Sequence, residues 1–201
     1  MGVPVHQVKE FAPRLSFGCS ISTPPYLALG LLDHPTRAQR VHDDWPKMAT
    51  YYAMIAGQGR GTVRTLPNFQ DPLVRYNLPD PDRLDLADGL RKLSQILFES
   101  GAAEIYPGLT GCPHLSVTDD LKRLPEILPV GLGNLMTIHL FSSCPMGEDK
   151  SKCPVNSFGQ LRGFKNLFIA DASLLCTAPG VNPQGSVMAF ARRNVLHFLG
   201  R

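Results

Sequence analysis

The stretch NLFIADASLLCTAPGVNPQGSVMAFARRN, residues 166–194, decides the fold because it is typical of a strand followed by a loop and a helix. A short apolar run at 167–169 predicts a buried sheet strand over 166–170. Asp171 follows at the carboxyl end of that strand, where we expect a polar side chain to face a crevice.

The helix is predicted to start with Asn182 as its N-cap and Pro183 as its first residue, where a missing N–H does no harm. Gly185 would let a ligand approach the backbone closely, and Gly200 would end the helix. Apolar residues at spacings of three and four predict one packed face, formed by Met188, Ala191, Val195 and Phe198. We expect the helix start to stay open, and its free N–H groups and partial positive charge suit an anionic group.

A second stretch, HLFSSCPMG at 139–147, contains a candidate general base. The pKa of a histidine, about 6.5, lets small environmental shifts set His139 as a base or an acid near neutrality. Each polar candidate also has a structural interpretation. A lone histidine after apolar residues is more often structural, Asn182 is an ordinary helix cap, and Asp171 is suited to capping the following turn.

Together the two stretches resemble the C-terminal signature of the glucose-methanol-choline (GMC) family of flavin-dependent oxidoreductases, including its cholesterol oxidase and long-chain alcohol oxidase members. Several matched elements in order over about sixty residues are far more specific than any single one. The matching positions are, in order, His139, Cys144, Met146 with Gly147, Asp171 to Ser173, and Asn182 with Pro183.

The resemblance implies a mechanism and a cofactor, FAD. In the family the residue at the His139 position takes the hydroxyl proton of an alcohol while a hydride passes to flavin N5. The residue at the Asn182 position hydrogen-bonds the substrate oxygen. The resemblance also implies contacts with the cofactor from Asp171, Ala172, Asn182, Pro183 and Gln184. Ser142 and Ser143 stand where many relatives have Gly-Thr, which adds bulk near the flavin.

The chain resembles only the C-terminal part of the family, because no strand, G-x-G-x-x-G turn and helix unit for FAD occurs in it. The nearest candidate, GQGRGT at 57–62, leads into a β-like segment, so we interpret it as a turn in which Gly59 and Gly61 supply positive φ. We predict an α+β fold. Residues 1–165 would form a substrate-binding portion, a mixed or largely antiparallel sheet with helices and the catalytic His loop. Residues 166–201 would be the last strand and helix of an FAD-binding domain whose N-terminal part is missing.

The middle of the chain predicts scaffold elements. Leucines at helical spacing predict a core-facing helix over 83–100, formed by Leu86, Leu90, Leu93 and Leu97. Alternation predicts a half-buried strand over 73–79, with Val74, Tyr76 and Leu78 on one side, and an apolar run from Thr50 predicts another strand.

Composition excludes several classes of function. The net charge of +3 and the pI near 8.6 are mild, and the basic residues are dispersed, so a nucleic-acid partner is not expected. The six histidines and five cysteines show no metal-binding spacing, so we predict no metal. No apolar run is long enough for a transmembrane segment or a signal peptide, which makes a cytoplasmic location the default expectation.

Two function classes remain. The first is the catalytic and substrate half of a GMC-type FAD-dependent alcohol dehydrogenase or oxidase, inactive without an N-terminal FAD-binding half. Its partners would be a small-molecule alcohol and, in a split enzyme, a separate N-terminal FAD-binding chain. The alternative is a non-catalytic fragment or binding module of the same fold without cofactor. We favour the enzyme because His139 and Asn182 both stand at the required spacing.

Overall fold

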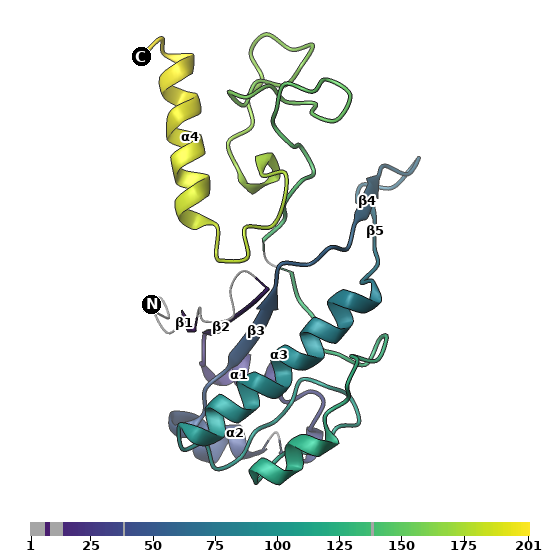
Figure 1. Cartoon of the computed structure of the whole chain (residues 1–201), viewed down its shortest axis with the longest axis vertical. Coiled ribbons are helices and arrows are strands. Elements are labelled where there is room, and N and C mark those ends of the chain that lie inside the picture. The colour runs from purple at the N-terminus through teal and green to yellow at the C-terminus, as the bar shows by residue number, and fades with distance from the viewer. Residues whose placement is uncertain (1–6, 9–13, 38, 138) are drawn as a thin grey trace. The chain divides into compact units, whose positions relative to one another are not determined.

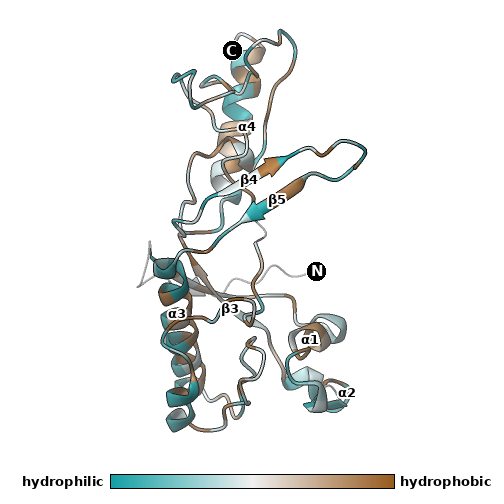
Figure 2. Cartoon of the chain, turned by 90° about the vertical axis from the view of Figure 1, so that its right-hand side faces the viewer, coloured by the Kyte–Doolittle hydropathy of each residue, from teal (hydrophilic) through white to brown (hydrophobic). Residues whose placement is uncertain are grey.

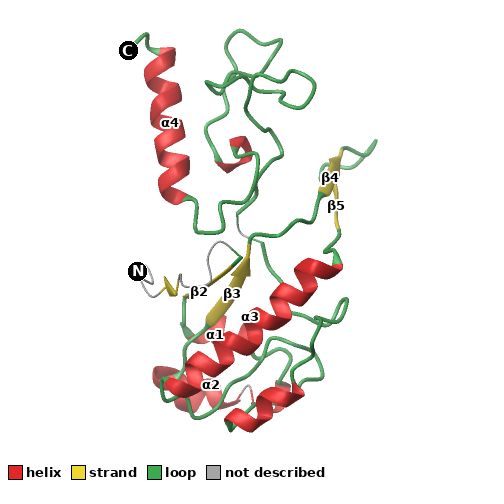
Figure 3. Cartoon of the chain, in the orientation of Figure 1, coloured by secondary structure: helices red, strands yellow, loops and turns green. Residues whose placement is uncertain are grey.

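The computed structural model describes residues 7–8, 14–37, 39–137 and 139–201 (Figure 1). The chain divides into two compact units, one comprising Met1–Gly61 and Tyr76–Leu135 and the other Thr62–Arg75 and Met136–Arg201. Helices and small sheets are both present, which confirms the α+β class (Figure 3). The predicted division at residue 165 falls inside the second unit, and the assignment of 166–201 to an FAD-binding domain stays a prediction.

The first unit contains an antiparallel sheet with the strand order β1-β2-β3. Its strands are β1 (Gln7–Val8), β2 (Leu15–Cys19) and β3 (Tyr51–Ile55). Leu15 pairs with Ile55 and Cys19 with Tyr51, so β2 and β3 are aligned over their full length. The strand predicted from Thr50 is therefore confirmed as β3.

Helix α3 (Asp80–Glu99) packs against this sheet. Leu93 is buried with Leu15 and Phe17, and Gly89 lies so close to β3 that an added Cβ would be 3.1 Å from the Ala53 Cβ. The other predicted leucines, Leu86, Leu90 and Leu97, pack against a second cluster built around Ile105 to Leu128. The predicted core-facing helix is confirmed, although it begins at Asp80 and not at residue 83.

Shorter helical segments complete the first unit. Leu27, Leu31 and Val41 form a small cluster between two of them, α1 and α2. The segments are α1 (Pro24–Gly30), η1 (Pro35–Arg37), α2 (Gln39–Asp44), η2 (Trp45–Lys47) and η3 (Thr118–Arg123).

Strands β4 (Gly61–Arg64) and β5 (Leu73–Tyr76) form a separate two-stranded sheet (Figure 2). Val74 is 62% and Tyr76 55% exposed, so the prediction of a half-buried strand is wrong. The reason is that β5 pairs only with β4, and a two-stranded ribbon has no further layer against which to bury a face.

The turn before β4 also differs from the prediction, because neither Gly59 nor Gly61 has a positive φ. Gly59 is required for a different reason. A Cβ there would lie 2.6 Å from the Tyr76 hydroxyl oxygen and 2.8 Å from the Asn77 carbonyl oxygen.

The second unit contains η4 (Ala172–Leu174) and α4 (Gln184–Phe198) among loops. The strand predicted over 166–170 is not formed, and the segment makes only an isolated bridge between Phe168 and Gln160. A strand exists by pairing with neighbours, and here the loop at 159–161 is the single neighbour among the described residues. Leu167 is accordingly 42% exposed and not buried.

The start and the predicted packing face of α4 also need correction. Pro183 occupies the N-cap position, so Asn182 precedes the cap, and no side chain caps the helix. Met188, Val195 and Phe198 are 64%, 51% and 62% exposed, so the predicted packed face is largely exposed, although the Phe198 ring meets the Phe168 ring edge to face. Among the residues described, no helix is both long and apolar enough to cross a membrane.

Candidate functional site

The loop that follows His139 is tied by hydrogen bonds to the turn that follows Asp171. The Cys144 N–H donates to the Ser173 carbonyl at 3.2 Å, and the Met146 N–H donates to the Leu174 carbonyl at 3.1 Å. The Cys176 thiol lies 3.3 Å from the Met146 carbonyl oxygen. Two stretches that are separate in sequence therefore form one local structure.

The Ser142 side chain also links the two segments. Its hydroxyl lies 2.9 Å from the Leu175 carbonyl oxygen and 2.8 Å from the Cys176 carbonyl oxygen. Its φ is 63°, in the left-handed region that favours glycine. The sequence predicted added bulk at Ser142 but not its positive φ.

His139 lies three residues before Ser142 and is partly buried. Its ring is 6.0 Å from that of Phe141, at an interplanar angle of 34°. Within the described part of the chain, no residue hydrogen-bonds its imidazole. The described residues therefore do not occupy its ring nitrogens with a hydrogen bond, which a general base also requires.

The predicted cofactor contacts at 171–172 form a capped turn. Asp171 is exposed, and its Oδ1 accepts a hydrogen bond of 2.8 Å from the Ser173 N–H at the start of η4. Leu174, in the same turn, is buried and anchors it. The interpretation of Asp171 as a turn cap is confirmed, and its contact with a cofactor stays a prediction.

The start of α4 is open, as predicted. Gln184 and Gly185 are exposed, and a Cβ added to Gly185 would meet no atom within 4 Å. Pro183 is buried and its carbonyl accepts from the Val187 N–H at 2.9 Å, so the first turn is regular. Free N–H groups at the start of a 15-residue helix suit an anion or a developing negative charge.

Arg162 supports the segment between the two halves of the site. It donates to the Gly147 carbonyl at 2.6 Å and to the Cys153 carbonyl at 3.1 Å. The hydrogen bonds from Ser157, together with the Arg162 guanidinium, hold the pKa of Glu148 below its ordinary value. The Arg162 hydrogen bonds to backbone carbonyls therefore hold the loop after Met146, and residues 147–153 contain no helix or strand.

His139 and Asn182 lie in the same compact unit, and Asn182 is exposed beside the open helix start. The structure joins the His139 loop to the Asp171 turn, whereas the joint action of His139 and Asn182 on one substrate stays a prediction. No group of three or more potential metal ligands occurs among the described residues. The donors present, an imidazole, an amide and helix N–H groups, suit an organic ligand with an electron-rich oxygen.

Comparison with known proteins gives consistent matches. A family model described as GMC oxidoreductase matches residues 57–191. An uncharacterized GMC-type oxidoreductase of Sinorhizobium fredii is 40% identical over 192 residues, covering 95% of this chain and 38% of the relative. One of Mycobacterium tuberculosis is 35% identical over 179 residues, covering 85% of this chain and 27% of the relative. A long-chain-alcohol oxidase of Arabidopsis thaliana is 28% identical over 158 residues, covering 72% of this chain and 20% of the relative. The chain thus spans well under half the length of these relatives.

Proposed function

Because this chain belongs to the family of GMC oxidoreductases and matches its C-terminal part, we propose that it supplies the catalytic and substrate-binding half of an FAD-dependent alcohol oxidoreductase. The observation that carries this proposal is the hydrogen-bonded junction between the His139 loop and the turn at 171–176. The long-chain-alcohol oxidase among the relatives supports an alcohol as the substrate class.

The start of α4 fits the cofactor that the family implies. Exposed N–H groups and the open space at Gly185 would accept a planar, electron-rich ring edge. Such N–H groups stabilise a developing negative charge by about 1 kcal/mol each at an open helix start, and by more in a dry site. The residues that would hold FAD are Asp171, Ala172, Asn182, Pro183 and Gln184. When bound, FAD would supply the hydride acceptor.

His139 takes the proton in the proposed reaction. As the alcohol carbon loses its hydride, the hydroxyl proton passes to an imidazole nitrogen of His139, and a carbonyl product remains. Asn182 donates its amide N–H to the substrate oxygen and orients it, since an amide cannot titrate. The loop after His139, which is hydrogen-bonded to the turn at 171–176, keeps the imidazole in position, and correct position is the main requirement for a general base.

The proposed setting is a cytoplasmic protein that acts with an N-terminal FAD-binding polypeptide, in the same chain or supplied separately. The chain of 201 residues alone should then be colourless and inactive. Together with such a polypeptide it should become yellow and oxidise alcohols.

The test is flavin reduction in that assembled enzyme, followed by stopped-flow absorbance. His139→Ala should slow reduction by about a hundredfold or more, the usual scale for loss of a general base. His42→Ala is the matched control because the His42 side chain is 83% exposed in the other unit, and it should leave the rate unchanged. An unchanged rate in His139→Ala would remove His139 from the mechanism. A correctly assembled complex that binds no flavin would favour the non-catalytic binding module.

A further inference from the structure

The loops between residues 150 and 165 form a cavity of about 500 Å³ within the second unit. Its volume lies in the range of small-molecule sites, which is about 300–1,000 Å³. None of the described residues that line it is among those proposed to hold FAD or to take the proton. The cavity is therefore a second candidate binding site, and it does not depend on the proposed function.

The lining of the cavity is positively charged. Lys150, Arg162 and Lys165 line it, and among the described lining residues no side chain is acidic. Arg162 has one carboxylate partner, Glu148, at 3.5 Å. Neither Lys150 nor Lys165 forms an ion pair with any residue that the structure describes. The charges of two lysines are therefore available to a negatively charged ligand.

Hydrogen bonds within the loop hold the cavity wall in place. The Gln160 Nε2 donates to the Phe164 carbonyl at 3.1 Å and to the Lys165 carbonyl at 3.0 Å. The Phe164 N–H donates to the Leu161 carbonyl at 3.2 Å, and the Leu161 N–H donates to the Leu167 carbonyl at 3.0 Å. The backbone that carries Lys165 is therefore fixed before a ligand binds, which lowers the entropic cost of binding.

The same wall offers an apolar surface. Phe164 is 57% exposed and lines the cavity together with the half-buried Leu161. Asn156 and Gln160 line it too, but the Asn156 Oδ1 already accepts from the Gln160 N–H at 3.0 Å. Because an exposed aromatic ring favours contact with another ring, a ligand with a planar group suits this wall better than a wholly polar one.

We propose that the cavity binds a small organic phosphate monoester, whose phosphate pairs with Lys150 and Lys165 and whose planar body lies against Phe164. Lysine is a common phosphate ligand and acts there as a point charge. The residues involved belong to one compact unit, so the 201-residue chain itself carries the complete site.

Two quantities favour a phosphate monoester over other anions. Its charge is about −1.5 to −2 at pH 7, which two unpaired lysines balance, whereas a carboxylate carries a single charge. Inorganic phosphate has the same charge but is too small. It occupies little more than a few water molecules of about 30 Å³ each, so it would fill a minor part of the cavity.

The experiment is isothermal titration calorimetry of the 201-residue chain with phenyl phosphate, which joins the phosphate to a planar ring. We expect one saturable site with a Kd at or below about 1 mM. Phenol lacks the charge and should bind at least about tenfold more weakly. Benzoate, with a single charge, and inorganic phosphate, without the ring, should each bind at least about threefold more weakly.

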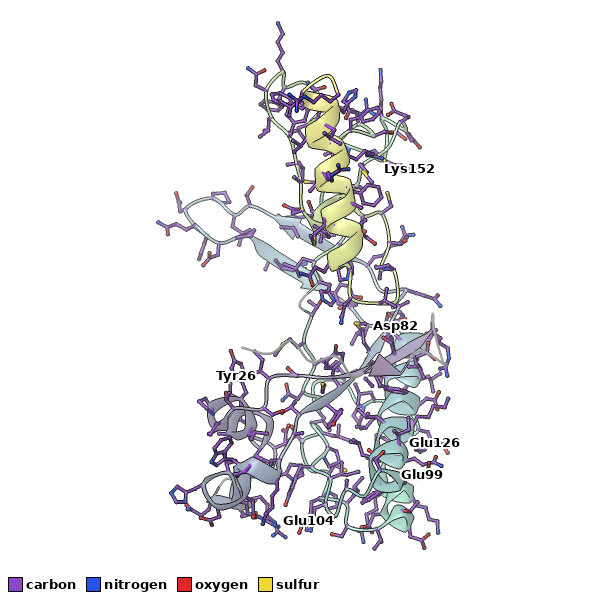
Figure 4. All side chains as sticks on the ribbon, turned by 90° about the vertical axis from the view of Figure 1, so that its left-hand side faces the viewer. Tyr26, Asp82, Glu99, Glu104, Glu126 and Lys152 are labelled. Carbon is purple, nitrogen blue, oxygen red and sulfur yellow. The ribbon has the colours of Figure 1, made fainter. Side chains whose placement is uncertain are left out.

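Variants locate the binding within the chain. Lys150→Gln and Lys165→Gln should each weaken the binding of phenyl phosphate at least about fivefold, because each removes one charge. Both lysines are exposed, so neither replacement disturbs a packed contact. Lys152→Gln is the matched control, since Lys152 (labelled in Figure 4) is 80% exposed, pairs with Asp149 at 3.2 Å and does not line the cavity. At 0.15 M salt it should change the affinity less than about twofold.

Each other outcome overturns the inference. Absence of saturable binding does so, and so does equal binding of phenol, benzoate or inorganic phosphate. Equal losses in the three lysine variants would show a general attraction of anions to positive charge and no binding in the cavity. Co-sedimentation with vesicles of phosphatidylcholine and phosphatidic acid, without binding of phenyl phosphate, would assign the lysines to a lipid surface.

Discussion

The Ser142 hydroxyl lies 2.9 Å from the carbonyl oxygen of Leu175, a residue 33 positions later in the chain. The neighbouring Cys176 carbonyl oxygen, at 2.8 Å, shares the single hydroxyl proton with the Leu175 carbonyl oxygen. A short side chain in a left-handed backbone conformation therefore joins the loop of the candidate base to the turn after Asp171. Residues 139–147 contain no helix or strand, so this link is one of the contacts that hold the loop after His139.

Two substitutions at Ser142 distinguish the contribution of its hydroxyl hydrogen bonding from the cost of its positive φ. Ser142→Ala removes the hydrogen bonds but keeps the positive φ, and should lower the free energy of unfolding by about 1 kcal/mol. Ser142→Gly also removes them but relieves the backbone strain, so it should be more stable than the alanine variant by about 1 kcal/mol. Urea denaturation of the three proteins measures both differences.

Ser143 provides the control for this comparison, since it is the adjacent serine, is exposed and makes no hydrogen bond to another described residue. Ser143→Ala should change the free energy of unfolding by less than about 0.5 kcal/mol. A glycine at 142 that is no more stable than alanine would show that the backbone there is not strained.

Gly159 should tolerate no side chain. Its φ is +84°, and an added Cβ would lie 2.4 Å from the Asn194 Nδ2 and 2.8 Å from the Ile169 carbonyl oxygen. Gly159→Ala should therefore lower the free energy of unfolding by about 3 kcal/mol or more, since the clash with backbone adds to the strain. Thermal or urea unfolding of the purified chain gives the value.

Gly163 has nearly the same backbone, with a φ of +87°, but an added Cβ there would meet no atom within 4 Å. Gly163→Ala should lower the free energy of unfolding only by the cost of a positive φ for alanine, about 1 kcal/mol. The difference between the two variants measures how tightly α4 packs on the loop. Equal losses would mean that the contact between Gly159 and Asn194 is looser than the structure has it.

The sequence predicted α3 well because its signals are local. Leucines at helical spacing lie on one face whatever surrounds them, and Leu93 is buried as that pattern requires. The same reasoning predicted a packed face on α4, where Val195 is 51% exposed. A periodic apolar pattern shows which side of a helix is suited to burial, but it does not show which residues pack against that side.

The sequence predicted the motifs of the candidate site but not the hydrogen bonds that join them. Spacing was enough to select His139 and the Asp171 turn, because each motif is continuous in sequence. The link through Ser142 depends on tertiary contacts with the Leu175 and Cys176 carbonyls, which no local pattern encodes. The segment 166–170 failed as a strand for a similar reason, because pairing is a non-local property.

Asp82 should be essential for the turn at 57–61. It is 2% exposed, and its carboxylate accepts from the Gln58 N–H at 2.9 Å and from the Gly59 N–H at 2.8 Å (labelled in Figure 4). Asp82→Ala leaves both donors without this acceptor, so the free energy of unfolding should fall by about 2–3 kcal/mol. Urea denaturation of the chain measures this loss.

Asp80 is the matched control in the same helical turn. Its carboxylate is 74% exposed and pairs with Arg83 at 2.8 Å, an exposed type of ion pair that contributes little. Asp80→Ala should lower the free energy of unfolding by no more than about 0.5 kcal/mol. Comparable losses in the two variants would show that the turn does not depend on the buried carboxylate.

Glu104 should make the stability of the first unit depend on pH. The Tyr106 hydroxyl and the Arg40 guanidinium both donate to its carboxylate, the latter at 2.8 and 2.7 Å. The hydrogen bond from Tyr106, followed by that from Arg40, holds the pKa of Glu104 below its ordinary value of 4.5. The unfolded chain therefore binds a proton at a higher pH than the folded chain does. The contribution of Glu104 is fully present above pH 4.5 and is lost as the pH falls through the lower, folded-state value.

Glu104→Gln removes this pH-dependent contribution, so the variant should be less stable than the natural chain at pH 7 and should approach it at pH 3. Urea denaturation at the two pH values measures the difference in free energy of unfolding between the variant and the natural chain. Glu126→Gln is the control because Glu126 forms no ion pair with any described residue, and at pH 7 it should lower the free energy of unfolding by less than Glu104→Gln does. A gap for Glu104→Gln that does not narrow on acidification would mean that the Tyr106 and Arg40 contacts stabilise the protonated carboxyl as well as the carboxylate.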